Sequence, residues 1–320
     1  MLSVLSKLYG RLVERRNTQY DHRQRPIVPV ECPVISVGNL SAGGTGKTPT
    51  VQMLVRMLRQ AGRRPAIVMR GYRRRSRGLV VVHDGVHMLA TVDAAGDEAA
   101  LHATVLGVPV VVSADKVEAA AYAAGNLPCD VIIVDDGFQH RALHRDVDVV
   151  IVDAATIGGS LLPAGRLREP LSSLKRADIV LLGTGVTTAD VQPHVKSTAC
   201  IYELTTTTSC PAPLNRPVVA VSGIARPERF HSALYDLGYT VAESIVYGDH
   251  HRYTAFNVRT ITAAATRHNA SVITTAKDQV KLLPLVADEE IRHHISVLEL
   301  EMHVSSSTSL LSALLSGITS

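Results

Sequence analysis

The chain has 320 residues, of which 46% are hydrophobic and 19% charged, and its formal net charge at pH 7 is +4. This balance is typical of a globular protein and argues against broad disorder, while the length favours two α/β lobes over one small core. Trp is absent and aromatic residues make up only 4%, which argues against base-stacking platforms, so we expect no nucleic acid partner.

The first 25 residues predict a basic amphipathic helix. Its apolar set is Leu2, Leu5, Leu8, Tyr9 and Leu12, and the basic set on the opposite face is Lys7, Arg11 and Arg15. Such a helix can attach reversibly to an anionic membrane surface, or it can pack on its own domain with a solvated basic face, and the sequence leaves both possibilities open. No apolar run is long enough for a spanning helix, so we expect any attachment to be peripheral.

The strongest motif lies between a predicted strand at 34–37 and a predicted helix at 51–58. It consists of Ser41, Ala42, Gly43, Gly44, Thr45, Gly46, Lys47 and Thr48. Strand, glycine-rich loop and helix in this order predict a phosphate-binding loop (P-loop), in which Lys47 reaches the β- and γ-phosphates and Thr48 binds Mg²⁺. Ser41 stands where the general pattern has glycine, so the motif is a variant loop. We expect a protein that uses a nucleoside triphosphate.

From residue 33 to about residue 210, short β-branched runs alternate with helix-like segments, which predicts a mostly parallel sheet with helices on both faces. The expected strands are 33–37, 65–69, 108–112, 131–134, 147–152 and 178–182. Residues 70–77 form a basic loop that either receives an anionic group or is simply solvated. Residues 79–88 predict a hairpin that turns at Asp84 and Gly85.

A threonine-rich stretch at 204–209, with prolines soon after it, predicts a linker to a second lobe. In that lobe we expect strands at 218–221, 241–246, 272–274 and 295–298, and helices at 229–237, 256–268, 278–286 and 307–315. The chain would then consist of an N-terminal helix (1–25), a P-loop domain (26–210) and a smaller C-terminal α/β lobe (211–320) that closes a substrate cleft.

Two groups of carboxylates are candidates for chemistry. Asp135 and Asp136 end a strand at the sheet edge where a P-loop protein places its second magnesium-binding acid, although a turn before Gly137 is the alternative. Asp135 is the better ligand candidate. Asp97 precedes a helix-prone stretch, where it is either the N-cap or a general base for an attacking hydroxyl.

Two further segments could contribute charged or titratable groups. His250 and His251 follow Asp249 after a strand of the second lobe, where they could bind a metal, handle protons or form a surface turn. Arg168, in the loop at 161–170, could bind phosphate bidentately or pair locally with Glu169. The four cysteines lie far apart without zinc-type spacing, which favours free thiols in a reducing cytosol and no structural metal.

Together these motifs resemble the tetraacyldisaccharide 4'-kinase family, which phosphorylates a glycolipid at the membrane in the lipid A pathway. The matching segments, in order through most of the chain, are 36–40, 43–49, 70–72, 96–98, 135–140, 161–170, 222–225, 249–251, 274–275 and 277–278. Ala99, Arg166 and Ala276 depart from the residues usual in these motifs, but none of them replaces a reacting group. The Asp-Asp-Gly-Phe-Gln-His block at 135–140 is the most specific of the segments.

The resemblance implies an ATP- and Mg²⁺-dependent P-loop kinase that phosphorylates the 4'-hydroxyl of tetraacyldisaccharide 1-phosphate to form lipid IVA. It also implies a peripheral protein at the cytoplasmic face of the bacterial inner membrane, whose partners are this glycolipid and the anionic membrane surface. We expect a monomer. The rival from another class is a membrane-targeted partition-type ATPase, for which we expect a lysine where this chain has Ala42.

The resemblance also assigns roles to residues. Asp97 is the expected base, supported by His250 or by the adjacent His251, and Asp136 serves the catalytic centre. Arg168 is expected to steady the transferring phosphoryl group. The cofactor ATP would lie on residues 41–48, and the expected magnesium ligands are Thr48, Asp135 and Glu98.

Overall fold

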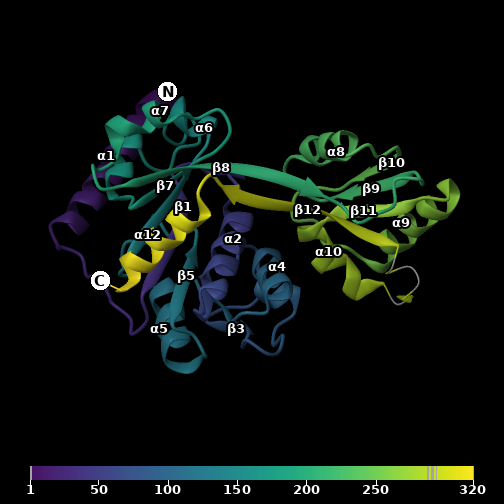
Figure 1. Cartoon of the computed structure of the whole chain (residues 1–320), viewed down its shortest axis with the longest axis horizontal. Helices are drawn as coiled ribbons and strands as arrows, with labels where there is room; N and C mark the ends of the chain where they lie inside the picture. Colours follow the sequence, from purple (N-terminus) through teal and green to yellow (C-terminus); the bar gives the residue numbers. More distant parts are fainter. Residues whose placement is uncertain (1, 287, 290–291, 293, 320) are drawn as a thin grey trace.

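The first lobe of the computed structural model is built on eight strands of a 12-stranded sheet that continues into a second lobe; the two lobes lie side by side in Figure 1. The structure describes residues 2–286, 288–289, 292 and 294–319. The strands are β1 (Val34–Asn39), β2 (Pro65–Met69), β3 (Val80–His83), β4 (Val110–Val112), β5 (Val131–Asp135), β6 (Val147–Val152), β7 (Ile179–Leu182) and β8 (Cys200–Ser209). Their spatial order is β8-β7-β6-β1-β5-β2-β4-β3, parallel except for β3. The predicted mostly parallel sheet is confirmed.

Helices cover both faces of this sheet, and its central strands are therefore buried on both sides. The helices are α2 (Lys47–Gln60), α3 (Val92–Ala95), α4 (Asp97–Leu106), α5 (Lys116–Asn126), α6 (Ala154–Ile157) and α7 (Thr188–Val191), with 3₁₀ turns η1 (Leu171–Arg176) and η2 (Gln192–His194). Ile35 of β1 packs in one cluster with α2 and α4, whereas the preceding Val34 packs with α5 on the other face. This alternation follows from the two-residue period of a strand.

The second lobe repeats the pattern on a smaller scale. Its parallel strands are β9 (Val218–Ser222), β10 (Val241–Val246), β11 (Ser271–Thr275) and the first half of β12 (Ile295–Val304), in the order β10-β9-β11-β12. Its helices are α8 (Pro227–Asp236), α9 (Ala255–His268) and α10 (Ala276–Leu282), followed by the turn η3 (Leu283–Leu285). Its buried side chains form separate clusters from those of the first lobe.

The stretch at 204–209 does connect the lobes, but it is not a loop-like linker, because these residues form the second half of β8. Thr205 to Thr208 pair antiparallel with the second half of β12, in register from Leu204 opposite Val304 to Ser209 opposite Glu299. Threonine is β-branched and favours extended backbone, so a threonine run is as suited to a strand as to a linker. The two strands form a ribbon that joins the lobes (Figure 1).

The last helix also differs from the prediction. α12 (Ser307–Thr319), expected in the second lobe, packs in the first lobe, where Leu310, Leu314 and Ile318 join the cluster that holds β1 and β6. The chain therefore crosses between the lobes twice, and both of its ends lie in the first lobe (Figure 1). The hairpin expected at 79–88 is formed in part: β3 pairs with β4, and the turn closes through a single bridge between His83 and Met88.

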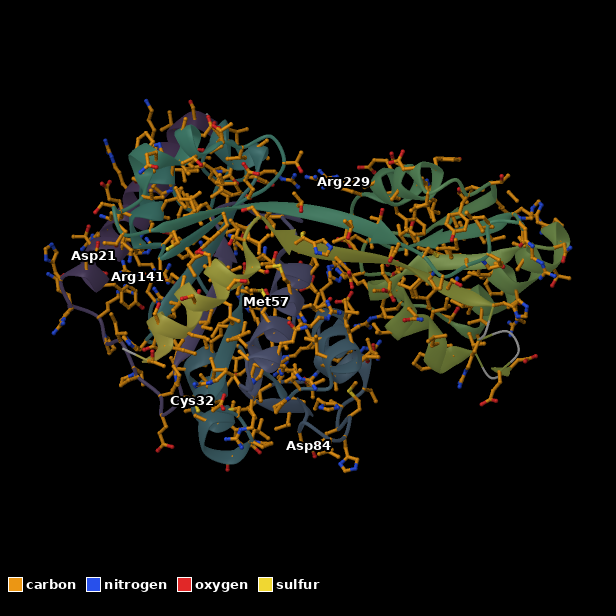
Figure 2. The ribbon with its side chains drawn as sticks, in the orientation of Figure 1. Asp21, Cys32, Met57, Asp84, Arg141 and Arg229 are labelled. Atoms are coloured by element: carbon orange, nitrogen blue, oxygen red, sulfur yellow. The ribbon has the colours of Figure 1, made fainter. Side chains whose placement is uncertain are left out.

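The N-terminal helix α1 (Leu2–Asp21) lies along the outer side of the first lobe (Figure 1). Its buried residues are Ser6, Asn17 and Tyr20, and its end is fixed by Arg141, which donates from Nη2 to Oδ1 of Asp21 at 2.8 Å (Figure 2). Leu2, Leu5, Leu8 and Leu12 are 45–59% exposed. The helix therefore packs on the lobe through its polar side and leaves its leucines uncovered. Among the described residues, no helix is both long and apolar enough to cross a membrane.

Candidate active site

The P-loop connects β1 to α2. Gly46 precedes α2 in the left-handed conformation (φ 83°), which favours glycine because this residue has no Cβ. Asn39 at the end of β1 braces the loop, since its Nδ2 donates to Oγ1 of Thr45 at 2.8 Å and its Oδ1 accepts from Nζ of Lys47 at 3.2 Å. Backbone N–H groups at the start of α2 and the Lys47 ammonium together suit a polyphosphate.

The variant start of the loop is tied to the segment at 161–170. Ser41 is buried and bridges to Leu167, while the N–H of Ala42 donates to the carbonyl of Arg166 at 2.7 Å. Gly43 and Gly44 beyond it are exposed. Ser41, which replaces the usual glycine, and the following Ala42 therefore anchor the loop, and the exposed part of the loop begins after them.

The carboxylate of Asp136 pairs with two positively charged side chains beside the P-loop. Arg168 binds it bidentately, with Nη1 to Oδ2 at 2.8 Å and Nη2 to Oδ1 at 2.7 Å, and Nζ of Lys47 lies 3.5 Å from Oδ1. Burial opposes the charge, but the bonds from Arg168 and the nearby Lys47 outweigh it and hold the pKa of Asp136 well below its usual range. Its backbone is left-handed at φ 55°, a strained conformation for aspartate. The local pairing of Arg168 with Glu169 does not form; Glu169 pairs with Arg176 instead.

Asp135 lies deeper, in register with Val37 of β1 at the carboxyl edge of the sheet. Its Oδ2 lies 3.2 Å from Nε2 of His102, a fully buried residue of α4. Nζ of Lys116 donates to the backbone carbonyls of Asp135 and Asp136 at 2.8 and 2.5 Å, and burial lowers the pKa of this lysine to about 8. His102 therefore holds the side chain of Asp135, and Lys116 holds the backbone of both aspartates.

Asp97 is the first residue of α4, and the cap of that helix is Gly96 rather than Asp97. Its Oδ2 lies 2.8 Å from Nδ1 of His250, which belongs to the second lobe. Tyr72 packs edge-on against the His250 ring with centroids 5.3 Å apart. The backbone of His250 is left-handed, with φ 59°, a strained conformation for a residue other than glycine. The structure therefore pairs a buried carboxylate with a histidine across the two lobes.

Two lysines of α10 surround the same carboxylate. Nζ of Lys277 and Lys281 lie 3.7 and 3.9 Å from Oδ2 of Asp97, and Lys277 also lies 3.4 Å from Glu98. Burial disfavours the charge of Asp97, yet the bond to His250 and the attraction of the two lysines prevail and lower its pKa. Asp97 is therefore ionised near neutral pH and able to accept a proton.

The neighbouring histidine has a different environment. His251 stacks on Tyr247 with centroids 4.3 Å apart and reaches Asn257 at 3.3 Å, inside the second lobe. Of the two histidines, only His250 is in contact with Asp97.

The residues expected to bind magnesium offer hard oxygen donors, namely a hydroxyl on Thr48 and carboxylates on Asp135 and Glu98, which is the donor set that Mg²⁺ prefers. Thr48 is half-buried at the start of α2, Asp135 ends β5, and Glu98 lies in the first turn of α4. In the part of the chain that is described, no group of three His, Cys, Asp or Glu is close enough to hold a metal by itself. The donor set therefore fits an ion that takes its remaining ligands from phosphate and water.

The basic loop at 70–77 is less free than its charge suggests. Arg74 donates to the carbonyls of Val112 and Gly78, and Arg75 pairs with Asp93 at 3.3 Å. Arg73 reaches across to the carbonyl of Asp249 at 3.0 Å. Three of these arginines therefore make contacts within the protein that hold the loop in place, and a role of the loop in receiving an anionic group stays a prediction.

Sequence reasoning gave no role to Asn39, Lys116, Lys277 or Lys281, all of which contact site residues. The sequence did hold a signal for two of them: Asn39 is the last residue of β1, and Lys277 lies two residues after the end of β11. Parallel sheets place binding residues at these carboxyl ends of their strands. Lys116 begins an ordinary helix and Lys281 lies within one, so nothing in their local sequence marks them.

Known proteins that are similar to this chain identify its family. The family model for tetraacyldisaccharide-1-P 4'-kinase, LpxK, matches residues 1–319. The chain belongs to this family. The tetraacyldisaccharide 4'-kinase of Chlorobium phaeovibrioides is 37% identical over 316 residues, covering 92% of this chain and 90% of the relative. That of Syntrophus aciditrophicus is 36% identical, covering 95% and 89%.

A solved member of the tetraacyldisaccharide 4'-kinase family has the same fold. The crystal structure of an "apo" form of LpxK from Aquifex aeolicus in complex with ATP is 32% identical, covers 98% of this chain and 97% of its own, and superposes with a TM-score of 0.83. The α/β fold and the family predicted from the motifs are thus confirmed. The chain is a phosphotransferase with an alcohol group as acceptor, a lipid A 4'-kinase.

Proposed function

We propose that this kinase transfers the γ-phosphoryl group of ATP to the 4'-hydroxyl of tetraacyldisaccharide 1-phosphate, with Asp97 as the base. The observation that carries the assignment of the base is the 2.8 Å contact between Asp97 and His250. A sugar hydroxyl is a weak nucleophile near neutral pH, and an ionised, oriented carboxylate can take its proton as it attacks. The hydroxyl oxygen forms a bond to the γ-phosphorus, the bond to the bridging oxygen of ADP breaks, and the proton goes to Asp97.

Lys47 and Arg168 serve the donor in this proposal. Both now share the carboxylate of Asp136, and the phosphate oxygens of ATP would compete for the same two cations. Arg168 is suited to the transferring group because its planar fork binds two oxygens at once. Asp136 then acts as the counter-charge that keeps both cations in place before ATP arrives. Phosphoryl transfer depends mainly on such positioning and charge stabilisation.

Thr48, Asp135 and Glu98 are the proposed magnesium ligands. A bound Mg²⁺ supplies positive charge to the β- and γ-phosphate oxygens. The contribution of this chain is to hold the oxygens: Asp135 is fixed by His102, and Glu98 is held by Lys277.

We propose peripheral binding of α1 to the anionic cytoplasmic face of the inner membrane, where the acylated substrate lies. The exposed leucines support this assignment, because a helix that packed through them would cover them. Lys7, Arg11 and Arg15 are exposed as well and would attract anionic head groups. A monomer suffices, since both halves of the proposed site come from one chain, and nothing in the site calls for nucleic acid.

The test is an assay with labelled ATP and the purified disaccharide. Asp97→Asn keeps the shape of the side chain and should lower turnover about 10²- to 10⁴-fold, because a general base is worth that much, while ATP binding is retained. The matched control is Asp84→Asn in the exposed turn after β3 (Figure 2), which should behave as wild type. Wild-type turnover in Asp97→Asn would refute the base, and ATP consumption independent of the disaccharide would favour a switch ATPase.

A further inference from the structure

The polar side of α1 is docked along the segment at 161–169. Oγ of Ser6 donates to the carbonyl of Leu161 at 2.8 Å and accepts from the N–H of Ala164 at 3.0 Å. Gly10 lies so close to Leu161 that an added Cβ would stand 2.8 Å from its side chain. Further along the helix, Nδ2 of Asn17 donates to the buried carboxylate of Glu169 at 2.9 Å. The helix is therefore seated by specific contacts over most of its length.

Two further contacts of α1 reach the backbone of site residues. The hydroxyl of Tyr9 donates to the carbonyl of Arg168 at 3.0 Å, and Nη2 of Arg16 donates to the carbonyl of Gln139 at 2.7 Å. Gln139 belongs to the turn that begins with Asp136. The helix thus holds the main chain of Arg168 and that of the turn that begins with its partner Asp136.

These two backbone positions converge on the P-loop. Nη2 of Arg168 donates to Oδ1 of Asn39 at 2.5 Å, and Nε2 of Gln139 donates to the carbonyl of Asn39 at 3.0 Å. Asn39 in turn binds Lys47 and Thr45. One residue therefore separates the segments held by α1 from the phosphate-binding lysine.

We propose that Tyr9 and Arg16 are positioning residues for phosphoryl transfer, so that the helix that meets the membrane is also a support of the donor site. The inference rests on the proposed function of Arg168 and of the P-loop. A displacement of about 1 Å in a positioned group can cost on the order of 10²-fold in rate. Loss of the contacts from Tyr9 and Arg16 frees two backbone segments that adjoin the reacting phosphates.

The two sides of α1 can be tested separately because they carry different residues. Tyr9→Phe removes one hydroxyl and Arg16→Met removes the donor to Gln139, whereas Leu8→Ser with Leu12→Ser alters only the exposed side, where these leucines are 54% and 59% exposed. Each protein is assayed for kcat and KM with the disaccharide in mixed detergent micelles, for ATP affinity without lipid, and for sedimentation with anionic vesicles. Thermal unfolding followed by circular dichroism verifies that each variant is folded.

We expect Tyr9→Phe and Arg16→Met each to lower kcat about three- to tenfold, the usual worth of one hydrogen bond, to weaken ATP binding in the absence of lipid, and to leave vesicle binding intact. Arg16→Lys restores a donor and should recover most of kcat. The leucine variant should lose vesicle binding and keep its ATP affinity in the absence of lipid.

Unchanged kcat and unchanged ATP affinity in folded Tyr9→Phe and Arg16→Met would overturn the inference and leave α1 as an anchor alone. The inference is equally overturned if the two variants only weaken vesicle binding. Failure of the proposed function gives a different result, since the wild-type protein would then not phosphorylate the disaccharide, while the comparison of ATP affinities would still test the support by α1.

Discussion

The ion pair between Glu169 and Arg176 offers a sharp test of how the loop beneath α1 is held. Oε2 of Glu169 accepts from Nη2 of Arg176 at 2.8 Å and from Nδ2 of Asn17 at 2.9 Å, and the two charged side chains are 1% and 9% exposed. Glu169→Gln keeps the size of the side chain but removes the charge. The buried guanidinium of Arg176 then loses its paired carboxylate and keeps its stacking on Phe138, 4.3 Å from the ring centroid, and the attraction of Asp148.

Breaking a buried pair by removing one partner typically costs about 3–5 kcal/mol, because the remaining charge is desolvated without compensation. The contact of Arg176 with Phe138 survives, and a glutamine can still accept from Asn17, so we expect a loss near the lower end, about 3 kcal/mol. An exposed pair gives the matched control. Glu243 and Arg267 are 3.2 Å apart but 32% and 65% exposed, and Glu243→Gln should cost about 0–1 kcal/mol.

The assay is urea unfolding followed by far-ultraviolet circular dichroism, since the chain contains no Trp. A loss below about 1 kcal/mol for Glu169→Gln, equal to that of the surface control, would refute the reasoning that burial makes this pair strong. A double-mutant cycle with Arg176→Met isolates the pairwise interaction.

The dependence on pH has a definite sign. Burial raises the pKa of Glu169, but the charge of Arg176 and the bonds from Arg176 and Asn17 outweigh it, so the net pKa lies below its ordinary value of 4.5. The stabilisation is therefore complete above about pH 4.5, where the unfolded carboxylate is also ionised, and is lost as pH falls through the lower pKa of the folded state. The difference in the free energy of unfolding between wild type and Glu169→Gln should therefore become smaller as the pH falls below about 4.5.

Three further predictions concern the site itself. His250→Ala should lower kcat on the order of 10²-fold, whereas His251→Ala should mainly lower the melting temperature because its ring packs on aromatic neighbours; equal effects of the two on kcat would contradict the pairing with Asp97. Gly96→Ala should destabilise the protein by about 1–3 kcal/mol, since φ is 87° and the new Cβ would stand 2.8 Å from the carbonyl of Tyr72; unchanged urea unfolding would contradict this. Chelation of Mg²⁺ with EDTA should abolish turnover, and added Mg²⁺ should restore it; full activity in EDTA would exclude the metal role.

Most strands can be predicted from the sequence because their signal is local. The runs at Val147–Val152 and Val241–Val246 predict strands with the observed bounds, since β-branched runs between turn residues have few alternatives to a strand. The P-loop is equally clear, because glycines at fixed spacing before a helix have a specific backbone purpose. Local patterns are enough wherever one short segment decides the structure.

The ribbon and α12 could not be predicted, because their placement depends on distant partners. The threonines at 204–209 become a strand only because the second half of β12 lies beside them. α12 has apolar residues at helical spacing, which predict a helix but not the lobe that covers it. The contact of Asp97 with His250 spans 153 positions of the sequence, and only the family resemblance suggested it.

The two lobes meet through charges rather than through a shared core. The buried apolar clusters belong either to the first lobe or to the second, as far as the described residues show. Across the junction, Asp97 and Glu98 at the start of α4 face Lys277 and Lys281 of α10, and the N-terminus of α4 further favours the two carboxylates. Because the junction carries these charged pairs and the described residues form no apolar cluster shared by both lobes, we propose that the lobes separate to admit the glycolipid and that the attraction between α4 and α10 returns His250 to Asp97 when they close.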